Sequence, residues 1–155
     1  MGLKDKIISE TEKVNSNNKA KEYLQQVKSA DLAINDKLEE LAKLEALATK
    51  INSVNEGERV QSSGSQDKVA DAVCEIADLK ADIDVEIKHL LALKREIREV
   101  IQKVGEPELM SILYKRYMQY KSWEKISVEL NISYRHATRL HGKALQNVEK
   151  ILNMS

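Results

Sequence analysis

The 155-residue sequence contains no phenylalanine, one proline, one cysteine, one tryptophan and five glycines, and aromatic residues make up only 4% of it. Chains with so few aromatic and turn-forming residues are poorly suited to β-sandwiches and β-barrels. Charged residues reach 32%, and a composition rich in Ala, Glu, Lys, Leu and Ile is typical of long helices. We therefore expect an all-α protein.

Other shortages exclude classes of site. Cys74 is the one cysteine, so the chain has neither an internal disulfide nor a cysteine metal cluster, and we expect Cys74 to be buried in a helix core. His136 and His141 are five residues apart, which does not place two metal ligands on one helical face. We expect no metal and no cofactor. The sequence also lacks a phosphate loop and a nucleophile with an adjacent base, so we do not expect an enzyme.

Long apolar runs are absent too. No segment has the length of a signal peptide or of a membrane span. We expect no membrane partner and a cytoplasmic location.

Glycine and proline divide the chain into three parts. Residues 1–17 are polar and are expected to form a flexible or weakly helical leader. Residues 18–104 contain two long tracts separated by a glycine- and serine-rich loop near 53–66, which predicts a long antiparallel helical hairpin of coiled-coil type. Residues 106–155 are expected to form a compact three-helix unit. Pairing between chains through the hairpin, and hence a homo-oligomer, is an open alternative.

Each long tract has apolar residues at alternating steps of three and four, the seam of a helix packed against a partner. The first seam is read as Leu24, Val27, Ile34, Leu38, Leu41, Leu44, Ala48 and Ile51, interrupted by Asp31. The second is read as Val69, Val73, Ile76, Leu79, Ile83, Ile87, Leu90, Ile97, Ile101 and Val104, interrupted by Lys94.

The loop "GERVQSSGSQDKV" lacks the Gly-Lys-Ser/Thr spacing of a nucleotide-binding loop, and no strand precedes it. A flexible turn is the simpler interpretation. The alternative is that Arg59, Gln61 and Ser62 contact a partner protein or a nucleic-acid backbone.

The last third of the chain has the signals of short helices. Gly105 ends the second long tract, and Pro107 suits the first position of a new helix. Ser122 and Ser133 are natural N-caps, and Asn131 between them suits a left-handed turn. A short helix, a tight turn and a longer helix predict a helix-turn-helix.

Charge favours nucleic acid as the partner of this segment. Residues 106–155 carry 8 Lys and Arg against 5 Asp and Glu, whereas residues 1–105 carry 17 against 20, and residues 133–143 contain no acid. The segment 133–145 is the expected recognition helix of a double-stranded DNA site, with Lys143 and Lys121 on flanking phosphates. The remaining expected DNA contacts are Ser133, Tyr134, Arg135, His136, Thr138 and Arg139.

The segment "YKRYMQYKSWEKISVELNISYRHATRLHGKAL" resembles the helix-turn-helix of sigma-factor region four, notably in its "I..ELNIS" turn. The wider span of about 20–153, with "KLEELAKLEALATKI", "GERVQSSGSQDKVAD" and "LKREIREVI", resembles an uncharacterised family of phages and prophages of Gram-positive bacteria. It is similar to the ArpU-type and RinA-type regulators, a resemblance that implies a role in switching on phage late genes inside a bacterial host cell.

Three functions remain open from the sequence. The first is a sequence-specific regulator of phage transcription, with the hairpin serving oligomerisation or contact with RNA polymerase. The second is a DNA-packaging protein similar to a small terminase. The third is a protein-interaction module that does not bind DNA.

Overall fold

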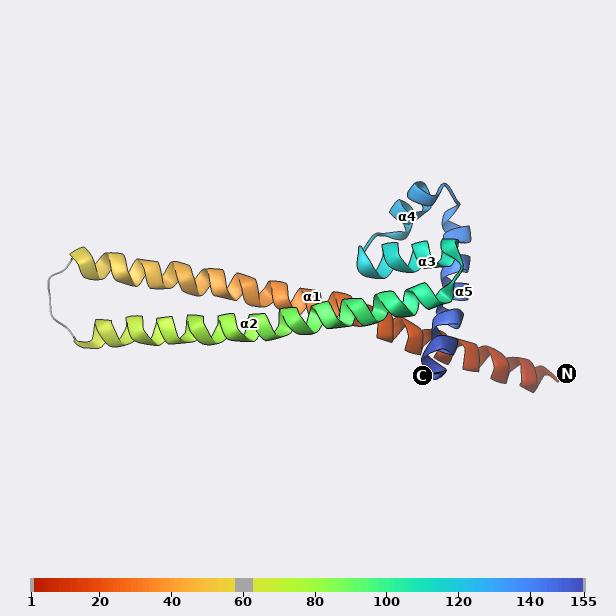
Figure 1. The fold of residues 1–155 in the computed structure, drawn as a ribbon, viewed down its shortest axis with the longest axis horizontal. Coiled ribbons are helices and arrows are strands. Elements are labelled where there is room, and N and C mark those ends of the chain that lie inside the picture. Colours follow the sequence, from red (N-terminus) through yellow and green to blue (C-terminus); the bar gives the residue numbers. More distant parts are fainter. Residues whose placement is uncertain (1, 58–62, 155) are drawn as a thin grey trace. The chain divides into compact units, whose positions relative to one another are not determined.

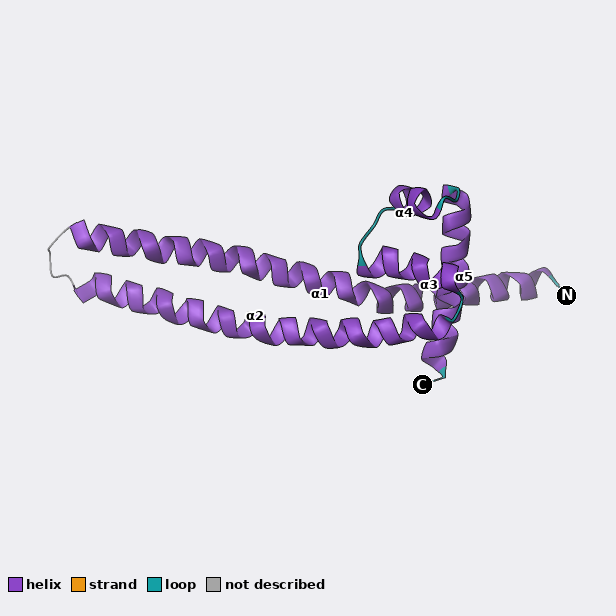
Figure 2. Ribbon diagram, turned by 45° about the horizontal axis from the view of Figure 1, so that its top comes forward, coloured by secondary structure: helices purple, strands orange, loops and turns teal. Residues whose placement is uncertain are grey.

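The structure is a computed structural model that describes residues 2–57 and 63–154. Its elements are the helices α1 (Leu3–Gly57), α2 (Ser63–Val104), α3 (Pro107–Leu113), α4 (Trp123–Leu130) and α5 (Tyr134–Asn153), with one π-helical turn, η1 (Tyr114–Met118), after α3. Within the described residues there is no strand (Figures 1 and 2). The expected all-α architecture, a helical hairpin followed by three short helices, is confirmed.

Packing divides the chain into two compact units. Unit 1 comprises Met1–Ser29 and Leu91–Ser155, and unit 2 comprises Ala30–Leu90. The division falls inside α1 and α2, whereas the division drawn from the sequence follows the end of α2. Ala20, Leu24 and Ile97 are fully buried, so the helix segments that hold them pack as part of unit 1.

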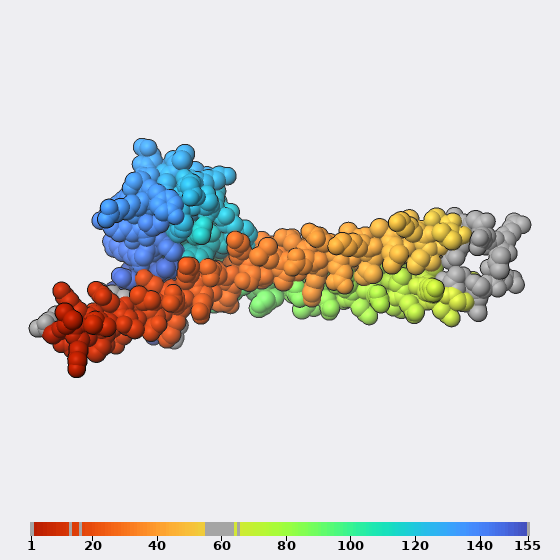
Figure 3. Space-filling model, turned by 180° about the vertical axis from the view of Figure 1, so that it is seen from behind, coloured from red at the N-terminus to blue at the C-terminus, as the bar shows by residue number. Residues whose placement is uncertain are grey.

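Unit 2 is the antiparallel hairpin itself (Figure 1). Lys37 on α1 pairs with Glu86 on α2, and Glu45 pairs with Lys80 at 3.1 Å. Residue numbers therefore rise along one arm as they fall along the other. In the space-filling view the two arms touch along their described length (Figure 3).

The phase of the seam differs from the expected one at three positions. Leu38, Val73 and Ile87 were expected inside and are exposed, with 42%, 56% and 37% of their surface accessible. The more enclosed positions are their preceding neighbours, among them Lys37 and Glu86. The seam of α2 then follows a regular three-four repeat through Val69, Ala72, Ile76, Leu79, Ile83, Glu86 and Leu90.

A polar pair in the seam explains this correction. Lys37 and Glu86 neutralise each other and hydrogen-bond across the helix interface, so neither side chain leaves an unpaired charge there. The hydrogen bond with Glu86 is also the main reason why the pKa of Lys37 is raised. The seam inferred from the sequence was chosen by hydrophobicity alone. It therefore took Leu38 and Ile87 in place of Lys37 and Glu86, one residue away from the observed positions.

Cys74 is likewise exposed rather than buried. It lies two residues after Ala72, on a part of α2 that turns away from the seam. The expectation of a core cysteine was therefore wrong.

The N-terminal segment expected to be a leader, residues 1–17, is helical from Leu3 onward. Its apolar side chains Leu3, Ile7 and Val14 are exposed. No helix within residues 2–57 and 63–154 is long and apolar enough to cross a membrane.

The C-terminal helices α3, α4 and α5 form one compact body within unit 1 (Figure 3). Gly105 adopts a left-handed backbone, with φ of 79°, directly after α2, and Pro107 begins α3 as expected. The buried core of this body is Leu109, Ile112, Leu113, Tyr117, Ile126, Ala137, Ala144, Leu145 and Val148.

Candidate nucleic-acid interface

Helices α4 and α5 are joined by the short turn that the sequence predicts. The hydroxyl oxygens of Ser122 and Ser133 accept hydrogen bonds from the backbone amides of Lys125 and His136, capping the two helices. Asn131 adopts the left-handed conformation, with φ 54° and ψ 45°. These local predictions are confirmed, and together they fix the direction in which α5 leaves the turn.

The outward face of α5 is basic. The exposed residues of this helix are Tyr134, Arg135, Arg139, Lys143, Gln146, Lys150 and Asn153. Its one acid, Glu149, is buried, with 8% of its surface accessible. No exposed side chain of α5 therefore opposes a polyanion, and four are positively charged.

The expected DNA contacts do not all lie on this face. Successive residues of an α-helix are about 100° apart, so Arg135, Arg139 and Lys143 follow one another along a single stripe at steps of four. Tyr134 is 51% exposed but lies near the opposite side of the first turn, and Thr138 is half-buried. The continuation of the stripe to Gln146 and Lys150, which the same spacing could have revealed, was not anticipated.

Hydrogen bonds order the first turns of α5. The Thr138 hydroxyl donates to the carbonyl of Arg135 at 3.0 Å, and this hydroxyl is therefore partly engaged by the helix. The guanidinium of Arg139 lies 2.8 Å from Nδ1 of His136, one turn earlier. Ser133 acts as the cap, so its oxygen already accepts a hydrogen bond within the protein.

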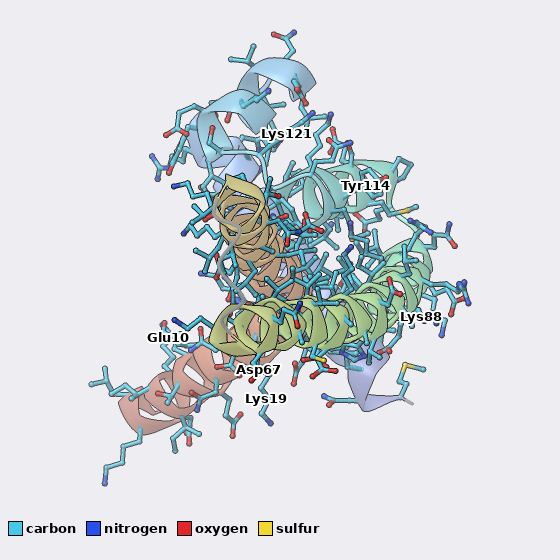
Figure 4. The ribbon with its side chains drawn as sticks, turned by 90° about the vertical axis from the view of Figure 1, so that its left-hand side faces the viewer. Glu10, Lys19, Asp67, Lys88, Tyr114 and Lys121 are labelled. Atoms are coloured by element: carbon cyan, nitrogen blue, oxygen red, sulfur yellow. The ribbon has the colours of Figure 1, made fainter. Side chains whose placement is uncertain are left out.

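The two lysines expected on phosphates are paired with carboxylates. Lys121, in the segment that leads into α4 (Figure 4), binds Glu129 at 2.8 Å, and Lys115 binds the same carboxylate at 2.7 Å. Hydrogen bonds from Lys115 and then Lys121 lower the pKa of Glu129 to about 2. Lys143 pairs with Glu106 at 3.1 Å, and both of these side chains are more than half exposed. The Lys143 pair is therefore open to exchange with a phosphate, whereas Lys121 is tied to α4.

A cluster of aromatic and cationic side chains supports α5 from behind. The Tyr117 hydroxyl lies 2.7 Å from Nε2 of His141, and the Trp123 ring centroid lies 4.6 Å from that of His141. Arg116 stacks over Trp123 at 4.8 Å and donates to the carbonyl of Lys121 at 2.9 Å. These contacts engage His141 within the protein, so this side chain serves the core rather than a ligand.

Burial, together with the nearby charges of Lys21 and Arg116, lowers the pKa of His141 to about 4. Burial also raises the pKa of Tyr117 to about 12. The sequence gave no sign that His141 joins Tyr117 and Trp123 in this cluster. Within the described residues, no group of three or more His, Cys, Asp and Glu side chains could hold a metal ion.

The loop residues Arg59, Gln61 and Ser62, proposed as partner contacts, lie outside the described residues.

Residues 50–149 match the family described as "Protein of unknown function (DUF1492)". The chain belongs to this family. The matched region is well over half of the 155 residues, and it includes α2, α3, α4, the turn after α4 and α5 as far as Glu149. In this DUF1492 chain Arg135, Arg139 and Lys143 of the basic stripe therefore lie inside the family region, Lys150 directly follows it, and most of α1 precedes it. No curated protein and no solved structure matches the chain.

Proposed function

We propose that the protein is a sequence-specific DNA-binding regulator of phage transcription, acting in the cytoplasm of a bacterial host, with α5 in the major groove. The observation that carries the proposal is the outward face of α5, where Arg135, Arg139, Lys143 and Lys150 are exposed and the only acid of the helix is buried. Arg side chains in a major groove can bind guanine edges, and lysines bind phosphates.

The construction of the turn supports the same proposal. A helix can read bases only if its N-terminal turns project from a rigid support. The caps at Ser122 and Ser133, the left-handed Asn131 and the packed cluster around His141 provide such a support. The resemblance of the turn to sigma-factor region four, and of the chain to ArpU-type and RinA-type regulators, motivates the late-gene role. The proposal assigns the protein no catalytic activity.

The distribution of charge between the units is the second support. Unit 1 holds 18 Lys and Arg against 11 Asp and Glu, a net charge of +7, whereas unit 2 holds 7 against 14, a net charge of −7. DNA attracts the first and repels the second. We therefore assign unit 2 to protein contacts, either with a second copy or with RNA polymerase. Its exposed apolar side chains, including Leu47, Val54 and Val85, suit such contacts.

The test begins with selection of binding sites by the full-length protein from a duplex library with a randomised core. A mobility shift on the selected duplex then compares the parent with Arg135→Ala and Arg139→Ala. Each change should weaken binding by about 1–3 kcal/mol, and the parent's affinity should fall steeply as salt rises.

Lys88→Ala is the matched control, because it removes one exposed cation from acidic unit 2 and should leave the shift unchanged. Absence of any retarded band at low salt, or arginine variants that bind like the parent, would refute DNA binding by α5. Mass measurement of the free protein separates the remaining alternative, since a closed ring of many subunits favours a packaging role.

A further inference from the structure

The contact between His136 and Arg139 fixes which hydrogen-bonding groups α5 can offer. A guanidinium has five N–H donors and no acceptor. At 2.8 Å from Arg139, Nδ1 of His136 must therefore be the acceptor. An imidazole that accepts at Nδ1 carries its ring proton on Nε2.

The pair consequently presents donors only. Arg139 is exposed and keeps its other N–H groups, and the Nε2–H of His136 is a further donor. In the major groove, guanine presents two acceptors, O6 and N7, whereas adenine and cytosine each present an amino donor. A donor-only pair matches the two acceptors of guanine, finds one acceptor beside a methyl group at thymine, and faces an amino donor at adenine and at cytosine.

Arg135 lacks this kind of support. Among the described residues no side chain hydrogen-bonds or pairs with its guanidinium, although it lies on the same face of α5 as Arg139. A long side chain that is held in place before binding loses less freedom when it binds. The difference separates a positioned arginine, suited to a base, from an arginine without a side-chain partner among the described residues, which is suited to a phosphate.

We infer that His136 is a positioning residue that holds Arg139 for recognition of a guanine in the DNA site. The inference rests on the proposed function. It adds to that function the base that Arg139 recognises, a guanine, and the residue that orients Arg139, which is His136. It predicts one guanine, in each site selected by the protein, whose recognition depends on both side chains.

The experiment uses the full chain and duplexes selected from the randomised library. At the guanine in question, 7-deazaguanine removes the N7 acceptor and adenine replaces O6 with a donor. Each replacement should weaken parent binding about tenfold, within the range of discrimination by a bidentate arginine. Arg139→Ala should bind all three duplexes equally.

Two changes at His136 separate positioning from mere bulk. His136→Leu removes the acceptor and should reduce the tenfold discrimination to about twofold, with the same salt dependence as the parent. His136→Gln, whose amide oxygen can accept from Arg139 while its amino group donates outward, should restore discrimination. Lys143→Ala is the control, because it should weaken binding to the three duplexes equally and reduce the salt dependence.

The outcomes distinguish the two proposals. A parent protein that selects no sequence overturns the proposed function and the inference with it. A parent that selects a site in which His136→Leu discriminates guanine as well as the parent does overturns the positioning role alone. Thermal unfolding of each variant, followed by circular dichroism, shows whether it is folded, and His136→Gln provides the second measurement if His136→Leu is not.

Discussion

Protonation of His141 should destabilise unit 1 at moderately acid pH. The ring is half-buried against Tyr117 and Trp123, and this burial, with the nearby charges of Lys21 and Arg116, lowers its pKa from 6.5 to about 4. The pKa of His141 is lower in the folded protein than in the unfolded chain. At a pH between these two pKa values, the unfolded chain therefore binds more protons than the folded protein. Stability from the neutral ring is therefore complete above about pH 6.5 and is lost as pH falls towards 4.

The magnitude follows from the two pKa values. A shift of one pKa unit corresponds to about 1.4 kcal/mol, and between pH 7 and pH 5 the linkage relation gives a loss of about 2 kcal/mol. Glu129, whose pKa is lowered to about 2, loses its contribution only at more acid pH. The window from pH 7 to 5 therefore isolates the histidine from this carboxylate.

Urea unfolding followed by the fluorescence of Trp123, the only tryptophan, measures the effect where it arises. His141→Gln retains a group that can hydrogen-bond to the Tyr117 hydroxyl and cannot be protonated in this range, so it should lose about 2 kcal/mol less than the parent between pH 7 and 5. His89→Gln, at an exposed histidine of unit 2, is the control and should behave like the parent. Equal losses in the parent and His141→Gln would refute the reasoning.

Three further predictions concern other parts of the fold. Asn131→Ala should lower the free energy of unfolding by about 1 kcal/mol, because alanine is strained in the left-handed conformation. Asn131→Gly should not lower it. Urea unfolding measures both variants, and equal losses would contradict this account. Lys37→Leu alone should lower the melting temperature, because it leaves Glu86 unpaired in the seam. The double variant Lys37→Leu with Glu86→Leu should have a higher melting temperature than the single variant. Calorimetry measures the melting temperatures of both variants. Cys74, being exposed, should react with a thiol reagent in the native protein about as fast as in urea, and strong protection of the native thiol would contradict its placement.

The sequence predicted the ends of the C-terminal helices well, because those signals are local, whereas it did not predict that α1 begins at Leu3. Pro107, Ser122, Asn131 and Ser133 act through their own backbone or through amides three residues away, so no knowledge of the tertiary fold is needed to interpret them. The π-helical turn from Tyr114 to Met118 carries no comparable signal, and it was not anticipated.

The phase of the hairpin seam could not be predicted in the same way. Two adjacent residues, such as Glu86 and Ile87, both fit a three-four repeat, and hydrophobicity favours the wrong one. Only the position of Lys37 on the other arm shows that Glu86 has a partner. Information of this kind lies in the pairing of residues 49 positions apart, which a periodic pattern along one helix does not contain.

A count of charges is a similarly incomplete guide to a DNA interface. The sequence offers eight basic residues in its last 50 positions, yet Lys115 and Lys121 share one carboxylate, and Arg116 lies over Trp123. These three cations stabilise the support rather than face a partner. What distinguishes Arg135 and Arg139 is that, among the described residues, no acid pairs with either of them on a helix whose one acid is buried. The availability of Arg135 and Arg139 on α5 therefore results less from an excess of positive charge than from the placement of the acids, which pair with Lys115, Lys121 and Lys143 instead.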